Sequence, residues 1–174
     1  MPLLEQSFSQ AKNSFSACHF LVGFDKCERF HGHNYSVTVK IKYSHENLTS
    51  TIDFRSVNSA IKQELQLLDQ KILLPEKSSD IKIRPSLEGK NWEVNVNNVK
   101  IYSFPKQDVL ILDGIKQTTT ESLAFYLHQR LSSWFQQNHP ELISTLDITV
   151  AENLGNQVKY SGPVQKILSP NDSL

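Results

Sequence analysis

Residues 34–43 alternate between polar and apolar side chains without interruption. The apolar positions are Tyr35, Val37, Val39, Ile41 and Tyr43, and the polar positions are Asn34, Ser36, Thr38, Lys40 and Lys42. Because side chains on a strand point alternately to opposite faces, this pattern predicts a strand with one buried and one solvated face. A strand of this kind needs neighbouring strands and a second layer that covers its apolar face.

Two segments show the spacing of amphipathic helices. Asp53 is a suitable N-cap for the first, and Thr118 and Glu121 have the spacing of a capping box at the start of the second. The helical apolar positions are Phe54, Val57, Ile61, Leu65 and Leu68 in the first segment and Leu123, Leu127, Leu131 and Trp134 in the second. We expect the first helix to end near the sequence LLDQKILLP.

The remaining elements complete an α+β order. Residues 14–20 predict a partner strand, joined to the alternating strand by the loop 21–30. Residues 76–107 are polar and are interpreted as an insertion, with a hairpin that turns at Asn97-Asn98. The sequences LDITVAEN and QVKYSG predict two final strands around Gly155. The sequence therefore predicts a single α+β domain over residues 1–174, an antiparallel sheet with two helices on one face.

The composition narrows the possible functions. Lysine plus arginine number 18 and aspartate plus glutamate number 18, so the formal net charge is zero. We therefore expect neither nucleic acid nor a membrane surface as the main partner. The N-terminal sequence does not resemble a secretory signal, and two cysteines are too few for a disulfide scaffold. A reducing, cytoplasmic setting is expected.

Three histidines are predicted to converge at one end of the sheet. His31 and His33 are two residues apart and alternate in step with Tyr35. Both side chains are therefore predicted to point to the apolar face, at the start of the strand. If residues 21–30 connect the two strands, His19 lies opposite them. Three imidazoles with an open fourth position are typical of a catalytic zinc site. The alternative is that the rings cap a sheet edge and bind no metal.

The chain resembles the family of 6-pyruvoyl-tetrahydropterin synthases and 6-carboxytetrahydropterin synthases, and most closely its longer, archaeal-like members. The matching sequences, in the order of the family, are FSACHF, CERFHGHNY, IDF, LLDQKILLP, TTESLA and VAENLGNQVKY. The resemblance implies a T-fold (tunnelling fold) in barrels, commonly homohexamers, with active sites between subunits. It also implies Zn²⁺ on His19, His31 and His33.

Cys27 and Glu28 are alternative proton-transfer groups. The family's catalytic cysteine stands where Cys27 stands, and a thiol beside a cation and basic neighbours has a lowered pKa. Glu28 occupies the position of a glutamate in members that cleave the dihydroneopterin side chain, so this chain combines both motifs. Glu28 is an alternative base or a solvated loop charge. Cys18 is interpreted as inert because its parity turns it away from His19.

The family pattern also suggests a pterin pocket. Glu152 has the parity of Leu146, Ile148 and Val150, and a carboxylate in register with aliphatic residues needs a donor. A pterin offers an amino group and a ring N–H, and the resemblance implies that Glu152 anchors them. The alternative places Glu152 in the turn after the strand. Thr119, Thr120 and Glu121 match family residues at the pocket and are also explained by helix capping.

One position departs from the family. The family pairs an aspartate with a histidine after the first helix, whereas this chain has Asp69 followed by Gln70. Glutamine forms hydrogen bonds but does not exchange protons near neutral pH. Three interpretations remain open. Glu28 or a histidine of another subunit replaces the missing relay, with His128 and His139 as candidate histidines; the reaction is side-chain cleavage; or the protein binds pterins without turning them over.

The resemblance implies a zinc-dependent pterin lyase that acts on 7,8-dihydroneopterin triphosphate. Its product is either 6-carboxytetrahydropterin, for the deazaguanine (queuosine and archaeosine) pathway, or 6-pyruvoyltetrahydropterin. Side-chain cleavage to a 6-hydroxymethyl pterin is the alternative reaction. A non-catalytic pterin-binding homologue is the alternative outside the enzyme class.

Overall fold

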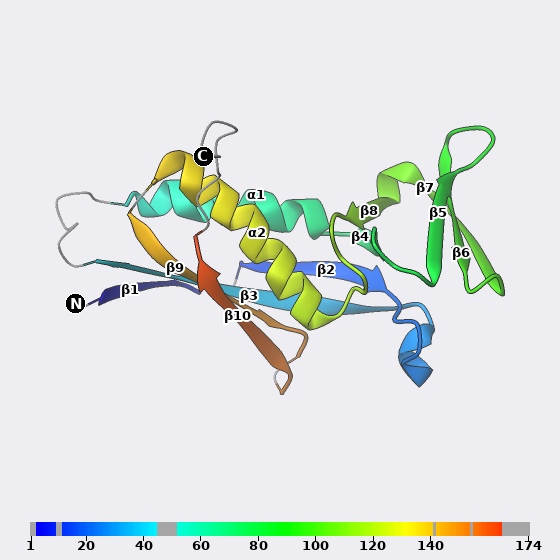
Figure 1. The fold of residues 1–174 in the computed structure, drawn as a ribbon, viewed down its shortest axis with the longest axis horizontal. Coiled ribbons are helices and arrows are strands. Elements are labelled where there is room, and N and C mark those ends of the chain that lie inside the picture. Colours follow the sequence, from blue (N-terminus) through cyan, green and yellow to red (C-terminus); the bar gives the residue numbers. More distant parts are fainter. Residues whose placement is uncertain (1–2, 10–11, 45–51, 141, 154, 165–174) are drawn as a thin grey trace, which may run out of the picture.

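The computed structural model describes residues 3–9, 12–44, 52–140, 142–153 and 155–164. Seven strands form the main sheet in the order β10-β9-β3-β2-β4-β8, with β1 also paired to β3 (Figure 1). These strands are β1 Leu3–Phe8, β2 Ser14–His19, β3 His31–Ser44, β4 Lys71–Pro75, β8 Val109–Leu112, β9 Ile143–Ala151 and β10 Gln157–Pro163. The predicted alternation of β3 is confirmed: the five predicted apolar positions are buried, and the intervening side chains lie on the opposite face.

Helices α1 (Phe54–Leu68) and α2 (Thr120–Asn138) cover one face of the sheet (Figure 1). The Asp53 side chain accepts a hydrogen bond from the Arg55 backbone N–H at 3.1 Å, so the predicted cap is confirmed. The buried side chains of α1 are Val57, Ala60, Ile61, Leu65 and Leu68, whereas Phe54 is 53% exposed. None of the described helices is long and apolar enough to cross a membrane.

The start of α2 differs from the prediction by one residue. Thr119, not Thr118, is the N-cap, and its side chain accepts a hydrogen bond from the Ser122 backbone N–H at 3.3 Å. Three consecutive threonines are locally equivalent as caps, so tertiary contacts select among them. The predicted stripe is also shifted, because Phe135 is fully buried and Trp134 only partly so.

The main sheet is mixed, and the prediction of a wholly antiparallel sheet was wrong in this respect. Strand β4 pairs parallel to β2 and to β8. Both strands are short apolar runs (KILLP and VLIL) without alternation, and such runs cannot be distinguished from a helix end by periodicity. The α+β arrangement with two helices on one face is confirmed.

The insertion forms a second sheet at one end of the molecule (Figure 1). Its antiparallel strands are β5 Ile81–Pro85, β6 Asn91–Val96 and β7 Lys100–Pro105. The predicted hairpin turn is confirmed: Asn97 and Asn98 have φ angles of 50° and 57°. A separate apolar cluster, Phe20, Leu74, Ile81, Val94 and Val96, joins this sheet to the main one. That residues 1–174 fold as one domain stays a prediction.

His128 is buried in α2 and predicts a pH-dependent stability. Burial lowers the pKa of its ring from the ordinary 6.5, and the ring centroid lies 4.8 Å from that of Tyr160. As the pH falls, the unfolded chain protonates this residue first, so its contribution to stability is complete above pH 6.5 and is lost below it. We expect His128→Gln to flatten the decline of the free energy of unfolding between about pH 7 and 5, measured by urea titration. His139→Gln is the control, and equal slopes in the wild type and His128→Gln would contradict the prediction.

Candidate metal and substrate site

The pairing of β2 with β3 brings three histidines together. His19 lies directly opposite His31 in the antiparallel register, and His33 follows two residues along β3 on the same face. One nitrogen from each of the three rings lies within 4.8 Å of the other two. The expected convergence is therefore present, and the assignment of these residues as metal ligands stays a prediction.

Two of the rings are oriented by backbone carbonyl groups. Nδ1 of His19 lies 2.8 Å from the carbonyl oxygen of Thr118, and Nδ1 of His31 lies 2.7 Å from that of Arg29. A carbonyl only accepts hydrogen bonds, so each Nδ1 is the donor and each Nε2 carries the lone pair that can bind a metal ion. Metal-binding histidines are commonly oriented in this way.

The third ring and the charge state of the first also suit a divalent cation. Nε2 of His33 is buried, has no well-oriented hydrogen bond, and lies 3.0 Å from Oε1 of Glu152. Burial lowers the pKa of His19 to about 4, so this ring is neutral near pH 7 and no proton competes for its lone pair. The three residues therefore fit zinc by their chemistry.

Gly32, between the two β3 histidines, allows β2 and β3 to approach closely. A Cβ atom at this position would lie 3.0 Å from the Ala17 carbonyl oxygen and 3.2 Å from Sγ of Cys18. We expect Gly32→Ala to lower the free energy of unfolding by about 1–3 kcal/mol, as overpacking does, measured by urea titration. Gly155→Ala is the matched control, because its Cβ would meet only Asn153 Oδ1 at 3.5 Å. Equal losses in the two variants would contradict this explanation.

A cleft of about 450 Å³ adjoins His19 and His31. Its other lining residues are Leu21, Phe24, Cys27, Thr119, Thr120, Glu121, Glu152, Gly155, Asn156, Gln157 and Val158. The cleft therefore contains a thiol, two carboxylates and two imidazoles. It also contains all four residues that we predict to bind the substrate, Glu152, Thr119, Thr120 and Glu121.

The structure separates the two candidate bases. Cys27 lines the cleft, whereas Glu28 faces the insertion. Oε1 of Glu28 accepts a hydrogen bond from the Gly23 backbone N–H at 2.8 Å, and Oε2 lies 3.6 Å from Nζ of Lys100. Both carboxylate oxygens are thus engaged outside the cleft, which favours Cys27 as the group nearer a bound substrate.

Glu152 combines the two interpretations made from its sequence. Strand β9 ends at Ala151, so Glu152 lies in the following turn. Its side chain nevertheless points toward the histidines, with Oε2 accepting a hydrogen bond from Thr120 Oγ1 at 2.9 Å and Oε1 near His33. A carboxylate held in this way can accept hydrogen bonds from a ligand in the cleft. Its role as pterin anchor stays a prediction.

Sequence reasoning assigned no site role to two residues that contact His19. The buried hydroxyl group of Tyr35 lies 3.4 Å from His19 Nε2, and burial raises the pKa of this phenol. Thr118 contacts the other side of the same ring through its carbonyl group. The parity that Tyr35 shares with His33 was the available signal for the first residue. No local pattern indicated the second.

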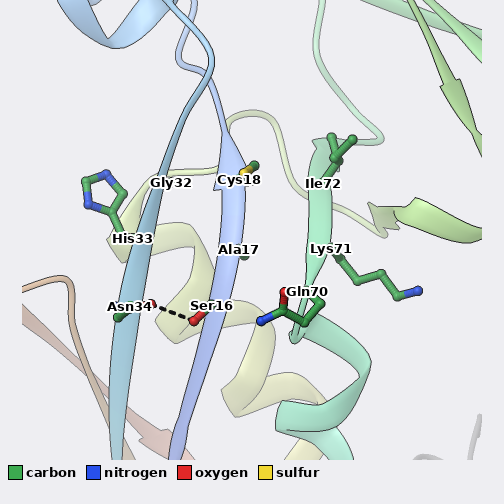
Figure 2. Close-up of a pocket in the computed structure, with 9 residues that line it drawn as sticks. All are labelled: Ser16, Ala17, Cys18, Gly32, His33, Asn34, Gln70, Lys71 and Ile72. Carbon is green, nitrogen blue, oxygen red and sulfur yellow. Dashed lines mark hydrogen bonds between the residues drawn. The ribbon is translucent and has the colours of Figure 1, made fainter.

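Asp69 and Gln70 do not join this cleft within one chain. Oδ1 of Asp69 accepts a hydrogen bond from the Ser16 backbone N–H at 2.8 Å. Gln70, with a φ angle of 58°, lies in a second groove beside β2 and β4. His33 is also among the residues that line this groove, although its ring points away from Gln70 (Figure 2). His128 and His139, the candidate replacements, line neither the cleft nor this groove.

Comparisons with known sequences identify the family of this chain. The sequence model of the 6-pyruvoyl tetrahydropterin synthase family matches residues 9–163. A candidate 6-carboxy-5,6,7,8-tetrahydropterin synthase of Methanocaldococcus jannaschii is 28% identical over 159 residues, which are 91% of this chain and 95% of the relative. One of Archaeoglobus fulgidus is 32% identical over 102 residues, 56% of this chain and 88% of the relative.

Solved structures show the same fold. The 6-pyruvoyltetrahydropterin synthase of Plasmodium vivax has a TM-score of 0.82 at 23% identity, covering 94% of this chain and 99% of that chain. The Plasmodium falciparum protein has a TM-score of 0.78 at 25% identity, covering 92% and 98%. The P. vivax protein has also been solved with a catalytic glutamate replaced by alanine or cysteine. The fold is therefore the T-fold of these enzymes, and the chain belongs to the 6-pyruvoyl tetrahydropterin synthase family.

Proposed function

We propose that this protein is a zinc-dependent pterin lyase that acts on 7,8-dihydroneopterin triphosphate. The observation that carries the proposal is the shared cleft: His19 and His31, each with Nδ1 held by a backbone carbonyl, adjoin the Cys27 thiol and the Glu152 carboxylate. Family membership supports a tetrahydropterin synthase activity, and the three-histidine cluster supports a bound cation.

Each residue of the cleft has a defined task in this proposal. Bound zinc, held by His19, His31 and His33, would supply a Lewis acid that polarises the side-chain oxygens of the substrate. Glu152 orients the pterin by accepting hydrogen bonds from its amino group and ring N–H. The Cys27 thiolate, the general base, takes a proton from the substrate side chain and holds it at Sγ. Thr120 keeps Glu152 in place through the 2.9 Å hydrogen bond.

Two products remain within the proposal. The archaeal relatives are named for 6-carboxytetrahydropterin, which supports that product. The deazaguanine pathway belongs to the proposal through the family resemblance alone. The Plasmodium structures are named for 6-pyruvoyltetrahydropterin. Side-chain cleavage to a 6-hydroxymethyl pterin is the second candidate, favoured by Glu28 and by the catalytic glutamate of the P. vivax protein. The contacts of Glu28 with Gly23 and Lys100 count against it.

The position of Asp69 supports an oligomeric active site. Asp69 is separated from Cys27 within one chain, so a relay that includes both needs a neighbouring subunit. We propose a homohexamer in which the groove beside Gln70 meets the cleft of another copy. In that arrangement Gln70 orients Asp69 by hydrogen bonding but transfers no proton.

The proposal is tested by incubating the zinc-loaded protein with 7,8-dihydroneopterin triphosphate and identifying the product by mass spectrometry. A carboxy or pyruvoyl tetrahydropterin is the expected result. A 6-hydroxymethyl pterin would move the assignment to side-chain cleavage. Bound but unchanged pterin would indicate a binding protein. The turnover of the Gln70→His variant then shows whether the proton relay of the wild type is complete. A large gain in turnover would mean that Gln70 damages the relay, and no gain would mean that the relay is complete without a histidine.

A further inference from the structure

The loop that carries Cys27 has little packing of its own. Its 3-10 helix, Asp25–Glu28, contains no buried residue. Within the loop, the Leu21 N–H donates to the Cys27 carbonyl at 2.7 Å and the Cys27 N–H donates to the Phe24 carbonyl at 2.9 Å. These bonds fix the shape of the loop but not its position relative to the histidines. That position therefore depends on contacts with other elements.

Strand β7 of the insertion contacts the loop through Glu28. Nζ of Lys100 lies 3.6 Å from Oε2 of Glu28, whose other oxygen accepts the Gly23 N–H at 2.8 Å. Glu28 thus connects the start of the loop, its 3-10 helix and the insertion. Because Cys27 is the adjacent residue, this connection acts on the backbone that carries the thiol.

The same strand contacts the aromatic residues at the two ends of the loop. The ring centroid of Phe30, the residue before His31, lies 6.0 Å from that of Tyr102 and 5.4 Å from that of Phe104. Phe20, at the start of the loop, lies 5.7 Å from both Phe30 and Tyr102. Aromatic pairs at these separations are mutually stabilising. In Figure 1 the loop and the insertion occupy the same end of the molecule.

We propose that β7 is a positioning element for Cys27: Lys100 acting through Glu28, and Tyr102 and Phe104 acting through Phe30, hold the loop so that the thiol faces the histidine-lined cleft. This inference rests on the proposed function for the catalytic importance of Cys27. It assigns Glu28 a structural task in place of proton transfer. It also assigns a task to the insertion, which the family resemblance leaves without one.

Thiol reactivity tests the inference without pterin or metal. In a Cys18→Ser background Cys27 is the only cysteine, so iodoacetamide labelling followed by mass spectrometry reports its exposure alone. We expect Lys100→Gln to raise the labelling rate by up to about fivefold, because the loss of a partly exposed ion pair has an effect of at most this size. Phe104→Leu, which removes the aromatic contact with Phe30, should raise it by about three- to tenfold.

Two further variants make the test specific. Lys100→Arg keeps the charge opposite Glu28 and should label at the rate of the parent. Arg84→Gln removes another ion pair of the insertion, between Arg84 of β5 and Glu93 of β6 at 2.9 Å, and it should also label at the parent rate. Equal rates for the parent, Lys100→Gln and Phe104→Leu would overturn the proposal. An equal increase in Arg84→Gln would overturn it too, by showing a general loosening of the insertion.

Kinetics tests the consequence for catalysis. Lys100→Gln is expected to lower kcat about two- to fivefold with KM unchanged, because Glu152 and the rest of the pterin pocket are not altered. Lys100→Arg should have the same kcat as the parent, because it keeps the positive charge opposite Glu28. A faster labelling rate together with an unchanged kcat would overturn the catalytic part of the proposal. If the parent makes no product, the proposed function fails, while the labelling experiment still decides whether β7 positions the loop.

Discussion

His31→Ala is expected to weaken zinc binding by at least about 100-fold and to abolish turnover. Loss of a residue that only hydrogen-bonds to a metal ligand already costs about 10- to 100-fold, and His31 is a direct ligand in the proposal. His31 suits this test since its ring is only partly buried, so the change removes a ligand without opening a core cavity. Zinc content after dialysis, and titration of the metal-free protein by calorimetry, measure the loss.

His139→Ala is the control for this experiment. His139 caps the C-terminal end of α2 against Trp134 and Phe135, and it does not belong to the three-histidine cluster. It should keep the zinc affinity of the wild type. If the His31→Ala protein binds zinc as tightly as the His139→Ala protein, the three rings cap the edge of the sheet and do not bind a metal.

Cys27→Ser is expected to lower kcat by about 10²- to 10⁴-fold, the usual cost of removing a general base. Zinc affinity and KM should change little, because the metal ligands and Glu152 are untouched. A hydroxyl group replaces the thiol at almost the same volume, so the loop keeps its contacts. Steady-state kinetics with product detection by mass spectrometry measures kcat and KM separately.

Glu28→Gln is the matched comparison for the same reaction. Glu28 is engaged by Gly23 and Lys100 outside the cleft, so its loss should cost about two- to fivefold, no more than Lys100→Gln costs. A loss larger than that of Cys27→Ser, together with a 6-hydroxymethyl product, would identify Glu28 as the base. The pair of variants thus decides between the two reactions.

Local periodicity was sufficient for the elements that carry the histidines. The alternation of residues 34–43 determined which face of β3 is buried, and with it the common direction of His31 and His33. Short sequence separation determined the pairing with β2, because a short loop between two strands favours an antiparallel hairpin. The Asn97-Asn98 turn was predictable for the same reason, since its positive φ angles depend on the residues themselves.

Contacts between distant segments decided the rest. Strands β4 and β8 are recognisable only from their parallel pairing. Thr118 contacts His19, 99 residues away in the sequence, and this contact leaves Thr119 as the N-cap of α2. The direction of Glu28 depended on Lys100 in the insertion. None of these contacts is indicated by a periodic pattern in the sequence. The sequence alone therefore predicted that three histidines converge at one end of the sheet, whereas only the tertiary structure decided which other side chains face them, because that choice depends on partners far apart in the chain.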